Sequence, residues 1–363
     1  MALTQVDQGL LGTNAQYTGF KNRIINGAMV IDQRNAGASV TPATGAYTLD
    51  RWCIFASQAS KFTIQQNAGS VTPPAGFTNY LGLTVGASAS VTVGASDYFL
   101  VDQVIEGFNL ADLGWGSASA QTVTVSFWVR SSLTGTFGGS VKAYSGTAYG
   151  YPFTYTINSA NTWEQKTITI TGPTSTWAAS TTNGGSAEVI FSVGAGSTYT
   201  GASGSWQAGT RFSANSCVNL ISTNSATFYI TGVQLEKGST ATSFDYRPYG
   251  TELALCQRYL PYFLIGDQNF ATGTCYGTAS SIISVPLPVQ TRVAPTGITS
   301  SGSTDWMAGT NSSVQTGTFA FNNATVKSVA IIMAVSGATQ GQAQLVAGRS
   351  AGTSYFYCTG CEL

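Results

Sequence analysis

Alternation of hydrophobic and polar residues is the dominant pattern in the first two-thirds of the chain. The clearest case is QTVTVSFWVRSS, in which Val123, Val125, Phe127 and Val129 alternate with Thr124, Ser126, Trp128 and Arg130. A period of two places one set of side chains on each face of a β-strand. The same pattern recurs at residues 166–171, 187–194 and 226–232. Runs of Gly, Ser, Asn and Thr separate these segments, so we expect short strands joined by turns.

Weaker patterns of the same kind extend this series. They lie at residues 47–55, 80–86, 97–106, 140–146 and 152–157. The chain thus shows roughly eight to ten short strands with no helical pattern between them, which indicates an antiparallel β-sandwich of jelly-roll type.

The pattern changes after Pro248. Residues 250–260, GTELALCQRYL, form the one predicted helix, with Thr251 as its N-cap and Glu252 in the first turn, where the helix dipole favours an anion. Strand patterns resume at 281–289, 326–337, 343–348 and 354–363. We therefore predict an arm at residues 1–20, a jelly-roll domain at 21–248, a linking helix at 249–260 and a smaller C-terminal β-sandwich domain at 261–363. The run 329–335 is apolar on both faces, which favours a strand buried between a sheet and a partner chain.

Composition excludes several classes of function. Fifteen basic and fifteen acidic residues cancel, so we expect no binding to nucleic acid and no attraction to an anionic membrane surface. The chain has no histidine, which removes the usual general base and every Ser-His or Cys-His nucleophile pair. The sequence also shows no signal-peptide pattern and no apolar run of the roughly 18 residues that span a bilayer, so we expect no membrane insertion.

Charge is concentrated in two regions of a chain that is only 8% charged. The first region follows residue 20 and the second surrounds residue 245. We predict that the two regions meet at an inter-domain seam, where arginines form forked pairs with carboxylates. The predicted seam residues are Arg23, Arg34, Asp50, Arg51, Glu236, Asp245 and Arg247. The alternative is a set of unrelated, solvated turns.

The same two regions carry a family resemblance. The segments NRIINGAMVIDQRNAG…YTLDRW (residues 22–52) and GVQLEKGSTATSFDYRPYGTELALCQRY (residues 232–259) resemble paired motifs of tail-fibre and related virion proteins of bacteriophages. In that group, a carbohydrate-binding-module-like sandwich lies between the motifs. The trailing VPLPVQTRVAPT (285–296) and the final EL also resemble the distal domain found after it.

The resemblance implies a virion structural protein, most simply a short tail fibre that recognises glycans of the host surface during adsorption. It implies a homotrimer located in the virion, after synthesis in the cytoplasm of the bacterial host. Residues 1–20 would dock to other virion proteins of the tail or baseplate, and bacterial surface polysaccharide would be the ligand. The C-terminal domain would be a distal tip or a trimer contact. A non-enzymatic head or tail decoration protein with a purely structural role is the alternative.

Clustered aromatic residues are the candidates for glycan binding, because aromatic faces stack on the C–H surfaces of sugars. Trp128 lies on the polar face of its strand, and Tyr144, Tyr149, Tyr151 and Tyr155 follow closely. These five predict a platform on one sheet, with packing against loops or a neighbouring subunit as the alternative. Trp306, Tyr355 and Tyr357 are a weaker candidate, and Trp115, Trp177 and Trp206 are expected to cover the ends of the sandwich.

Catalytic and metal-binding patterns are weak. A glycosidase needs two suitably spaced carboxylates; the pairs Asp102–Glu106, Glu236–Asp245 and Asp97–Asp102 lie in no recognisable motif, so we expect no enzyme. No cofactor is predicted, although Asp32 and Asp245 are possible ligands of a structural calcium ion. Cys358 and Cys361 form the one C-x-x-C among six cysteines. Ordinary buried thiols are favoured there over a metal or redox role, and whether the two are paired stays open.

Overall fold

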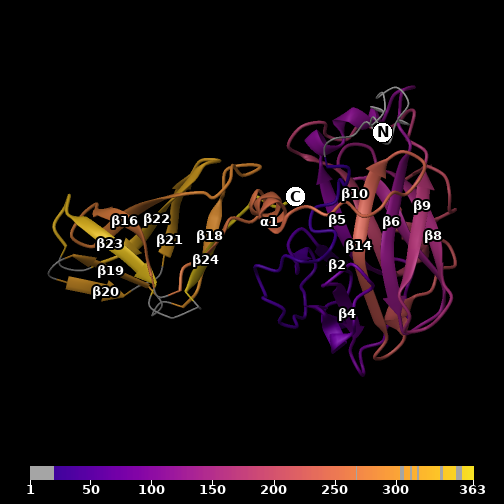
Figure 1. Ribbon diagram of the computed structural model, residues 1–363, viewed down its shortest axis with the longest axis horizontal. Helices are drawn as coiled ribbons and strands as arrows, with labels where there is room; N and C mark the ends of the chain where they lie inside the picture. The colour runs from indigo at the N-terminus through magenta and orange to yellow at the C-terminus, as the bar shows by residue number, and fades with distance from the viewer. Residues whose placement is uncertain are drawn as a thin grey trace, which may run out of the picture. The chain divides into compact units, whose positions relative to one another are not determined.

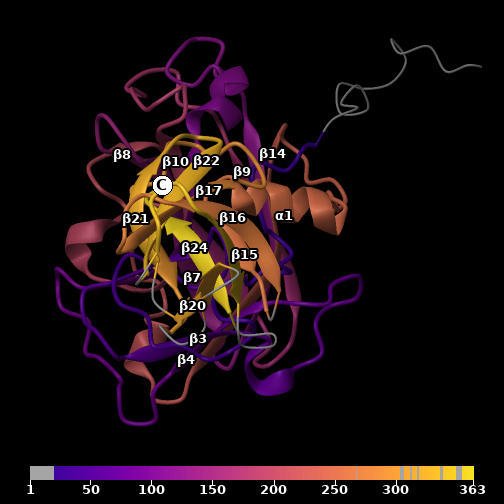
Figure 2. The ribbon, with the colours of Figure 1, turned by 90° about the vertical axis from the view of Figure 1, so that its left-hand side faces the viewer.

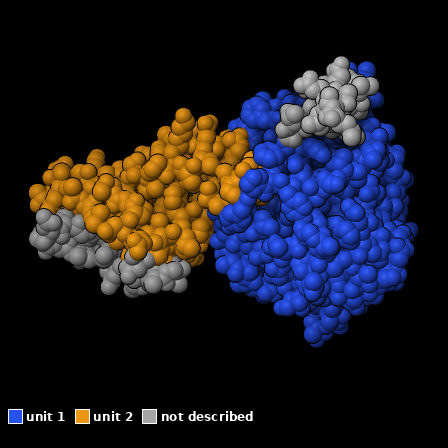
Figure 3. All heavy atoms as spheres, in the orientation of Figure 1, with its two compact units in different colours: residues 1–249, 363 blue, residues 250–362 orange. Residues whose placement is uncertain are grey.

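The structure is a computed structural model that describes residues 20–266, 268–302, 306–310, 313–316, 319–335, 338–348 and 354–363; at 306–310 and 313–316 it describes the backbone alone. The chain divides into two compact units, residues 1–249 with residue 363 and residues 250–362 (Figures 1 and 3). Of the predicted arm, residues 1–19 lie outside the described residues, so docking through the arm stays a prediction.

Unit 1 is the predicted antiparallel jelly-roll-type sandwich (Figure 1). Its first sheet has the order β1 (Ala46–Tyr47), β2 (Cys53–Ala56), β5 (Tyr98–Glu106), β10 (Gly185–Ala195), β7 (Gly135–Ala143), β8 (Tyr149–Ile157) and β12 (Gln207–Ala208). Its second sheet has the order β3 (Phe62–Gln66), β4 (Leu81–Val85), β14 (Thr227–Lys237), β6 (Val123–Ser131) and β9 (Glu164–Ile170). Short 3-10 turns lie at η3 (Ala68–Ser70), η4 (Gly107–Asn109), η5 (Ala111–Leu113), η6 (Ser197–Tyr199) and η7 (Leu220–Ser222).

The core of unit 1 lies between these two sheets and follows the alternation seen in the sequence. Val123, Val125, Phe127 and Val129 of β6 are all fully buried. Phe191 of β10 meets Phe127 across the core at a ring-centroid distance of 4.8 Å. The period-two prediction for this strand is therefore confirmed, because each second residue points into the space between the sheets.

A third layer covers the outer face of the seven-stranded sheet. It contains the two-stranded parallel pair of β11 (Thr200–Gly201) and β13 (Ser213–Ala214). A Cβ atom on Gly138 of β7 would lie 2.2 Å from the Ser213 hydroxyl, so this layer sits directly on the sheet. The strand β10 is buried along nearly its whole length.

Unit 2 contains the helix α1 (Tyr249–Gln257) from its second residue onward and continues as a smaller sandwich that can be followed in Figures 1 and 2. One sheet has the order β15 (Tyr262–Leu264), β24 (Tyr355–Thr359) and β18 (Gly297–Ser300). The other has the order β20 (Ser313–Thr316), β19 (Trp306–Thr310), β23 (Ala343–Gly348), β16 (Asn269–Cys275), β17 (Ser280–Pro286), β22 (Ser328–Ala334) and β21 (Phe319–Ala324). The C-terminal β-sandwich was predicted, and the structure shows it.

One local prediction in unit 2 is wrong and a second is tested in part. Because α1 starts at Tyr249, Thr251 lies inside the first turn and is not the N-cap. In β22, Val329, Ile331 and Met333 are buried, whereas Ile332 on the other face is partly exposed. The strand therefore buries one face against its own core, and burial of the other face by a partner chain stays a prediction.

No helix among the described residues is long and apolar enough to cross a bilayer.

The two charged regions do meet, but inside unit 1. Asp245 Oδ2 accepts hydrogen bonds from the backbone N–H groups of Lys21 (2.7 Å) and Asn22 (3.1 Å). Arg247 donates to the carbonyl oxygens of Ile24 (3.0 Å) and Asn22. These groups recognise backbone rather than one another, because residues 21–24 run beside β14, where Arg23 N–H bonds to the Leu235 carbonyl. These hydrogen bonds are therefore made to backbone groups, whereas the prediction paired arginines with carboxylates.

The remaining predicted seam residues also bind neighbours within unit 1. Glu236 accepts hydrogen bonds from the backbone N–H (2.8 Å) and hydroxyl (2.7 Å) of Thr242. Asp50 accepts two from Gln33. Arg51 donates to the Val104 carbonyl, and the Arg34 guanidinium lies 5.5 Å from the Tyr47 ring centroid.

Candidate functional site

Three tryptophans from distant parts of the sequence form one cluster in unit 1. The ring centroids of Trp115 and Trp177 lie 4.8 Å apart with the rings nearly perpendicular, at 86°. Trp206 contacts both, at 5.7 Å from Trp115 and 5.6 Å from Trp177. Edge-to-face geometry of this kind is favourable for aromatic pairs. The cluster is therefore a defined structural unit and not three separate loop covers.

Hydrogen bonds to the backbone fix two of the three indoles. Trp115 Nε1 donates to the Gln121 carbonyl (2.8 Å), and Trp206 Nε1 donates to the Thr171 carbonyl (2.6 Å). Trp177 differs from both: within the described part of the chain, its Nε1 has no hydrogen-bond partner. Because an indole N–H can only donate, Trp177 is left with one unused donor.

A close approach between two loops holds Trp177 in place. Gly116, directly after Trp115, has a φ of +88°, a conformation that glycine adopts without the penalty a side chain would bring. A Cβ atom on Gly116 would lie 2.6 Å from the Trp177 carbonyl oxygen. Gly116 N–H also donates to the Pro173 carbonyl at 2.8 Å. The loop after η5 and the loop between β9 and β10 are thus packed backbone to backbone.

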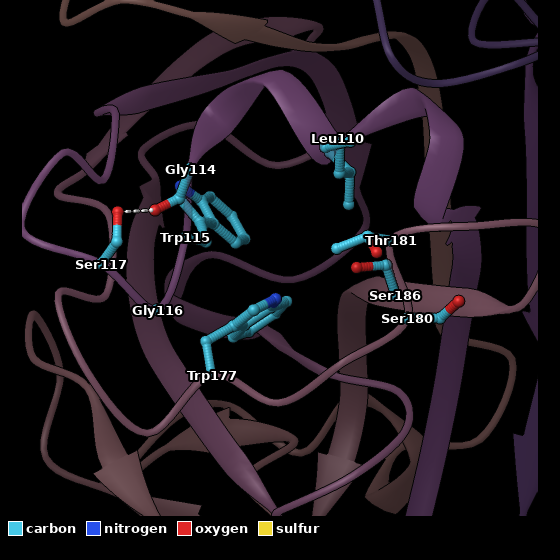
Figure 4. A pocket seen from close by; sticks show the side chains of 10 residues that line it. Leu110, Gly114, Trp115, Gly116, Ser117, Trp177, Ser180, Thr181 and Ser186 are labelled. Carbon is cyan, nitrogen blue, oxygen red and sulfur yellow. Dashed lines mark hydrogen bonds between the residues drawn. The ribbon is translucent and has the colours of Figure 1, made fainter.

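The tryptophan pair borders a pocket of about 200 Å³ (Figure 4). The pocket is lined by Leu110, Ala111, Gly114, Trp115, Gly116, Ser117, Trp177, Ser180, Thr181 and Ser186. In Figure 4 the Trp177 ring nitrogen faces the pocket, and the Ser186 hydroxyl points into it from the opposite side. The pocket therefore combines aromatic surface, one free N–H donor and hydroxyl groups. No side chain in its lining is charged.

Backbone hydrogen bonds from neighbouring segments hold residues 182–186, which follow Thr181 and include Ser186 of the pocket lining. Gly107 and Phe108 of η4 donate backbone hydrogen bonds to the carbonyls of Gly184 and Thr182, each at 2.8 Å. On the other side, Tyr144 N–H donates to the Ser186 carbonyl at 2.8 Å. The residues Phe108 and Tyr144 remain 60% and 41% exposed. Exposed aromatic residues thus border the segment that carries Thr181 and Ser186.

The five predicted glycan-binding residues do not form one platform. Trp128 lies on β6 of the five-stranded sheet, whereas the tyrosines belong to the seven-stranded sheet or follow it. Tyr149 stacks on Trp206 at 5.5 Å and 14°, and Tyr151 meets the same indole edge-on. Tyr155 is buried against Phe127 in the core. Two of the five thus join the tryptophan cluster, and the single-sheet arrangement is wrong.

The sequence patterns did not predict this pocket. The tryptophans lie in three Gly-, Ser- and Thr-rich loops, and no local pattern shows that these loops converge. A tryptophan flanked mainly by small residues is the available signal, and Trp115, Trp177 and Trp206 all fit it. Of the weaker distal candidates, Tyr355 and Tyr357 form a stack with Tyr262, at 5.5 and 5.9 Å. The Trp306 side chain lies outside the described residues.

The carboxylates and cysteines are occupied or buried. Asp32 accepts backbone hydrogen bonds from Asn35 (3.1 Å) and Gly37 (2.7 Å), and burial raises its pKa. In the described part of the chain, no group of three or more Cys, Asp or Glu residues is arranged to hold a metal ion, so the calcium site at Asp32 and Asp245 stays a prediction. Cys358 and Cys361 are free, buried thiols. Burial raises their pKa values to about 12 and about 11.

Asp102 is the most unusual carboxylate. It is fully buried on the outer face of the seven-stranded sheet, and neither of its side-chain oxygens has a hydrogen-bond partner among the described residues. Burial raises its pKa well above the usual range, and Glu188 raises it further, against the opposite effects of Lys142 and Arg51. Glu188 itself forms an ion pair with Lys142 on the neighbouring strand. Asp102 does not line the pocket, whose lining contains no carboxylate.

Comparisons with known proteins give partial similarities. No protein-family model matches the chain, and no curated protein matches it. Among solved structures, the enzymatically active domain of tailspike protein 4 from bacteriophage CBA120 is similar over 60% of this chain but only 21% of its own, with 14% identity and a TM-score of 0.34. A CBM4 structure matches 59% of this chain and 98% of its own, with 17% identity and a TM-score of 0.29.

A third similar structure is the family 11 carbohydrate-binding module of a cellulosomal cellulase from Clostridium thermocellum. It covers 58% of this chain and 100% of its own, with 11% identity and a TM-score of 0.28. With TM-scores below 0.5, these similarities assign neither a family nor a ligand to this chain.

Proposed function

We propose that unit 1 binds carbohydrate in the pocket bordered by Trp115 and Trp177. The observation that carries the proposal is the pairing of an unused indole N–H with aromatic surface and hydroxyl groups in one pocket. Sugars present C–H faces that stack on aromatic rings and hydroxyls that accept and donate hydrogen bonds. Both kinds of group are available here within a single concave site.

The residues of the pocket have separate roles in this proposal. Trp177 supplies a stacking surface and donates from Nε1 to a sugar hydroxyl. Trp115 forms the perpendicular wall, and Trp206 backs both rings. Ser186 and Thr181 provide hydroxyl groups that exchange hydrogen bonds with the ligand. The backbone hydrogen bonds of Trp115 and Trp206 keep the aromatic surface rigid, which lowers the entropic cost of binding.

The wider role that we propose is glycan recognition by a bacteriophage particle, with bacterial surface polysaccharide as the ligand. The resemblance of residues 22–52 and 232–259 to virion-protein motifs supports this setting. Assembly as a homotrimer and attachment through residues 1–20 belong to the same proposal. A decoration protein of the head or tail with a purely structural role is the alternative, and it predicts stoichiometric incorporation into particles without binding to cells.

The test is binding of the purified full chain to an array of bacterial surface polysaccharides and to intact host cells. We expect saturable binding that soluble polysaccharide competes away. Trp177→Ala should weaken it at least about tenfold, which corresponds to ~1.4 kcal/mol. Trp128→Ala is the matched control, because it removes a partly exposed tryptophan from the other sheet.

Each outcome separates the candidates. Loss of binding in Trp177→Ala alone supports the tryptophan pocket. Loss in Trp128→Ala alone would move the site to the outer face of the five-stranded sheet. No binding by the folded wild-type chain would favour the decoration protein.

A further inference from the structure

We infer that the tryptophan pocket takes one terminal, uncharged sugar unit of a glycan, and not an internal stretch of a chain. This inference rests on the proposed function and specifies its ligand. It follows from three properties of the pocket, namely its size, its shape and its charge.

The size of the pocket fits one sugar ring. At about 200 Å³, it is smaller than the roughly 300–1,000 Å³ of pockets that enclose drug-sized ligands of several rings. A long binding cleft for several consecutive sugar units would instead extend along a sheet face or between loops. Here the aromatic residues in the lining of the pocket are Trp115 and Trp177, whose centroids are 4.8 Å apart.

The shape of the pocket favours the end of a glycan. Two rings at 86° to each other form a corner rather than a flat platform. Thr181 and Ser186 stand across from this corner (Figure 4), and Leu110 closes a further side. An internal sugar unit is linked to a neighbour at two positions, so its site must be open on two sides to let both neighbouring units leave the pocket. A terminal unit needs one, which the open side of this corner provides.

The absence of charge in the pocket lining disfavours acidic sugars. None of the ten lining residues is charged, and the charged groups nearby are already paired. Arg23 lies 2.7 Å from Asp112, and Lys142 is paired with Glu188. A carboxylate or phosphate on the bound sugar would therefore lose water without gaining a cationic partner, which is costly. A neutral hexose or an N-acetylated hexosamine has no such penalty.

The experiment is competition for the polysaccharide that the full chain binds in the array. The competitors are methyl glycosides of neutral hexoses, of N-acetylhexosamines and of uronic acids, each tested up to roughly 100 mM, with millimolar dissociation constants expected for a single sugar. We expect at least one neutral methyl glycoside to displace the polysaccharide fully and to change tryptophan fluorescence. The matching uronate should be at least about tenfold weaker. The fluorescence change should persist in Trp128→Ala and vanish in Trp177→Ala.

The outcomes distinguish failure of this inference from failure of the proposed function. If only oligosaccharides of several units compete, the pocket binds an internal stretch of the glycan. That result would overturn the inference, whereas the proposed carbohydrate binding would still be supported. Stronger competition by the uronate would likewise overturn it. If the folded chain binds no polysaccharide and no methyl glycoside, the proposed function fails and the inference with it.

Discussion

Arg23 forms an ion pair with Asp112 that connects the start of the unit 1 sandwich to one wall of the tryptophan pocket. Arg23 Nη2 lies 2.7 Å from Asp112 Oδ2, and Nη1 donates to the Asn109 carbonyl at 2.9 Å. Asn109 ends η4 and Asp112 lies in η5, the two turns that lead to Leu110 and Trp115. Because Arg23 N–H also bonds to the β14 backbone, one residue ties the last long strand of the sandwich to the pocket.

Removing this connection should weaken both the fold and the pocket. The Asp112 side chain is 46% exposed, so the ion pair is worth about 0.2–1 kcal/mol. We expect Arg23→Ala to lower the free energy of unfolding by about 1 kcal/mol and to weaken glycan binding by a few fold. Urea unfolding and a glycan titration measure the two effects. Arg130→Ala, which removes an arginine from β6 of the five-stranded sheet, is the control; equal binding in both variants would show that Arg23 does not position the pocket.

Gly116 offers a sharper test of the pocket geometry. Gly116 and Gly204 both have a φ of +88°, but a Cβ atom would meet the Trp177 carbonyl at 2.6 Å in the first case and nothing within 4 Å in the second. Both Ala substitutions carry the same backbone strain, about 1–2 kcal/mol. Gly116→Ala should therefore cost more stability than Gly204→Ala and should also reduce glycan binding. Thermal unfolding and binding of both variants provide the comparison, and similar losses in the two would contradict the close approach of the loops.

Asp102 should make the stability of unit 1 fall as the pH rises. Burial raises its folded-state pKa well above the usual range, whereas the unfolded chain loses this proton at about pH 4. Between these two pKa values the folded state binds more protons, so stability is greatest below the lower value and declines towards the higher one, by up to about 1.4 kcal/mol per pH unit. Asp102→Asn has no proton to lose. Its stability relative to the wild type should increase from about pH 4 to about pH 8 in urea unfolding.

Asp97 is a control, because its pKa is shifted in the direction opposite to that of Asp102. The Gly94 backbone N–H, followed by the Ser57 and Gln58 side chains, lowers its pKa. Its contribution to stability is present above the unfolded pKa and is lost as the pH falls, so Asp97→Asn should weaken the protein at neutral pH and converge with the wild type in acid. A stability difference for Asp102→Asn that stays constant with pH would show that Asp102 titrates normally.

The sequence predicted what depends on local periodicity. The alternating residues of β6 were assigned to the correct faces because period-two alternation directly reports burial on one side of a strand. It could not show which strands share a sheet, so Trp128 of β6 was grouped with Tyr149 of β8, although these strands lie in different sheets. Sheet membership depends on pairings between distant segments. The same reason hid the convergence of the three tryptophan loops.

The burial of individual polar residues also could not be predicted from the sequence. Asp102 lies in a segment with an alternating strand pattern, and such a pattern does not show that this carboxylate is fully buried. The charged seam shows a related limit. The meeting of residues 21–24 with Asp245 and Arg247 could be anticipated from charge density, whereas the choice of backbone partners depends on geometry.

The two separate cores predict two unfolding transitions. Phe356 of β24 is fully buried in unit 2, where it stacks on Phe263 at 4.5 Å and contacts Phe270 and Phe319. Phe356→Ala should destabilise unit 2 by about 3–5 kcal/mol and lower one calorimetric transition, while the other transition and glycan binding stay unchanged because the pocket lies in unit 1. Tyr276→Ala, which removes an aromatic side chain that is 74% exposed in the same unit, should leave both transitions in place. A single transition that shifts as a whole in Phe356→Ala would mean that the two units unfold together.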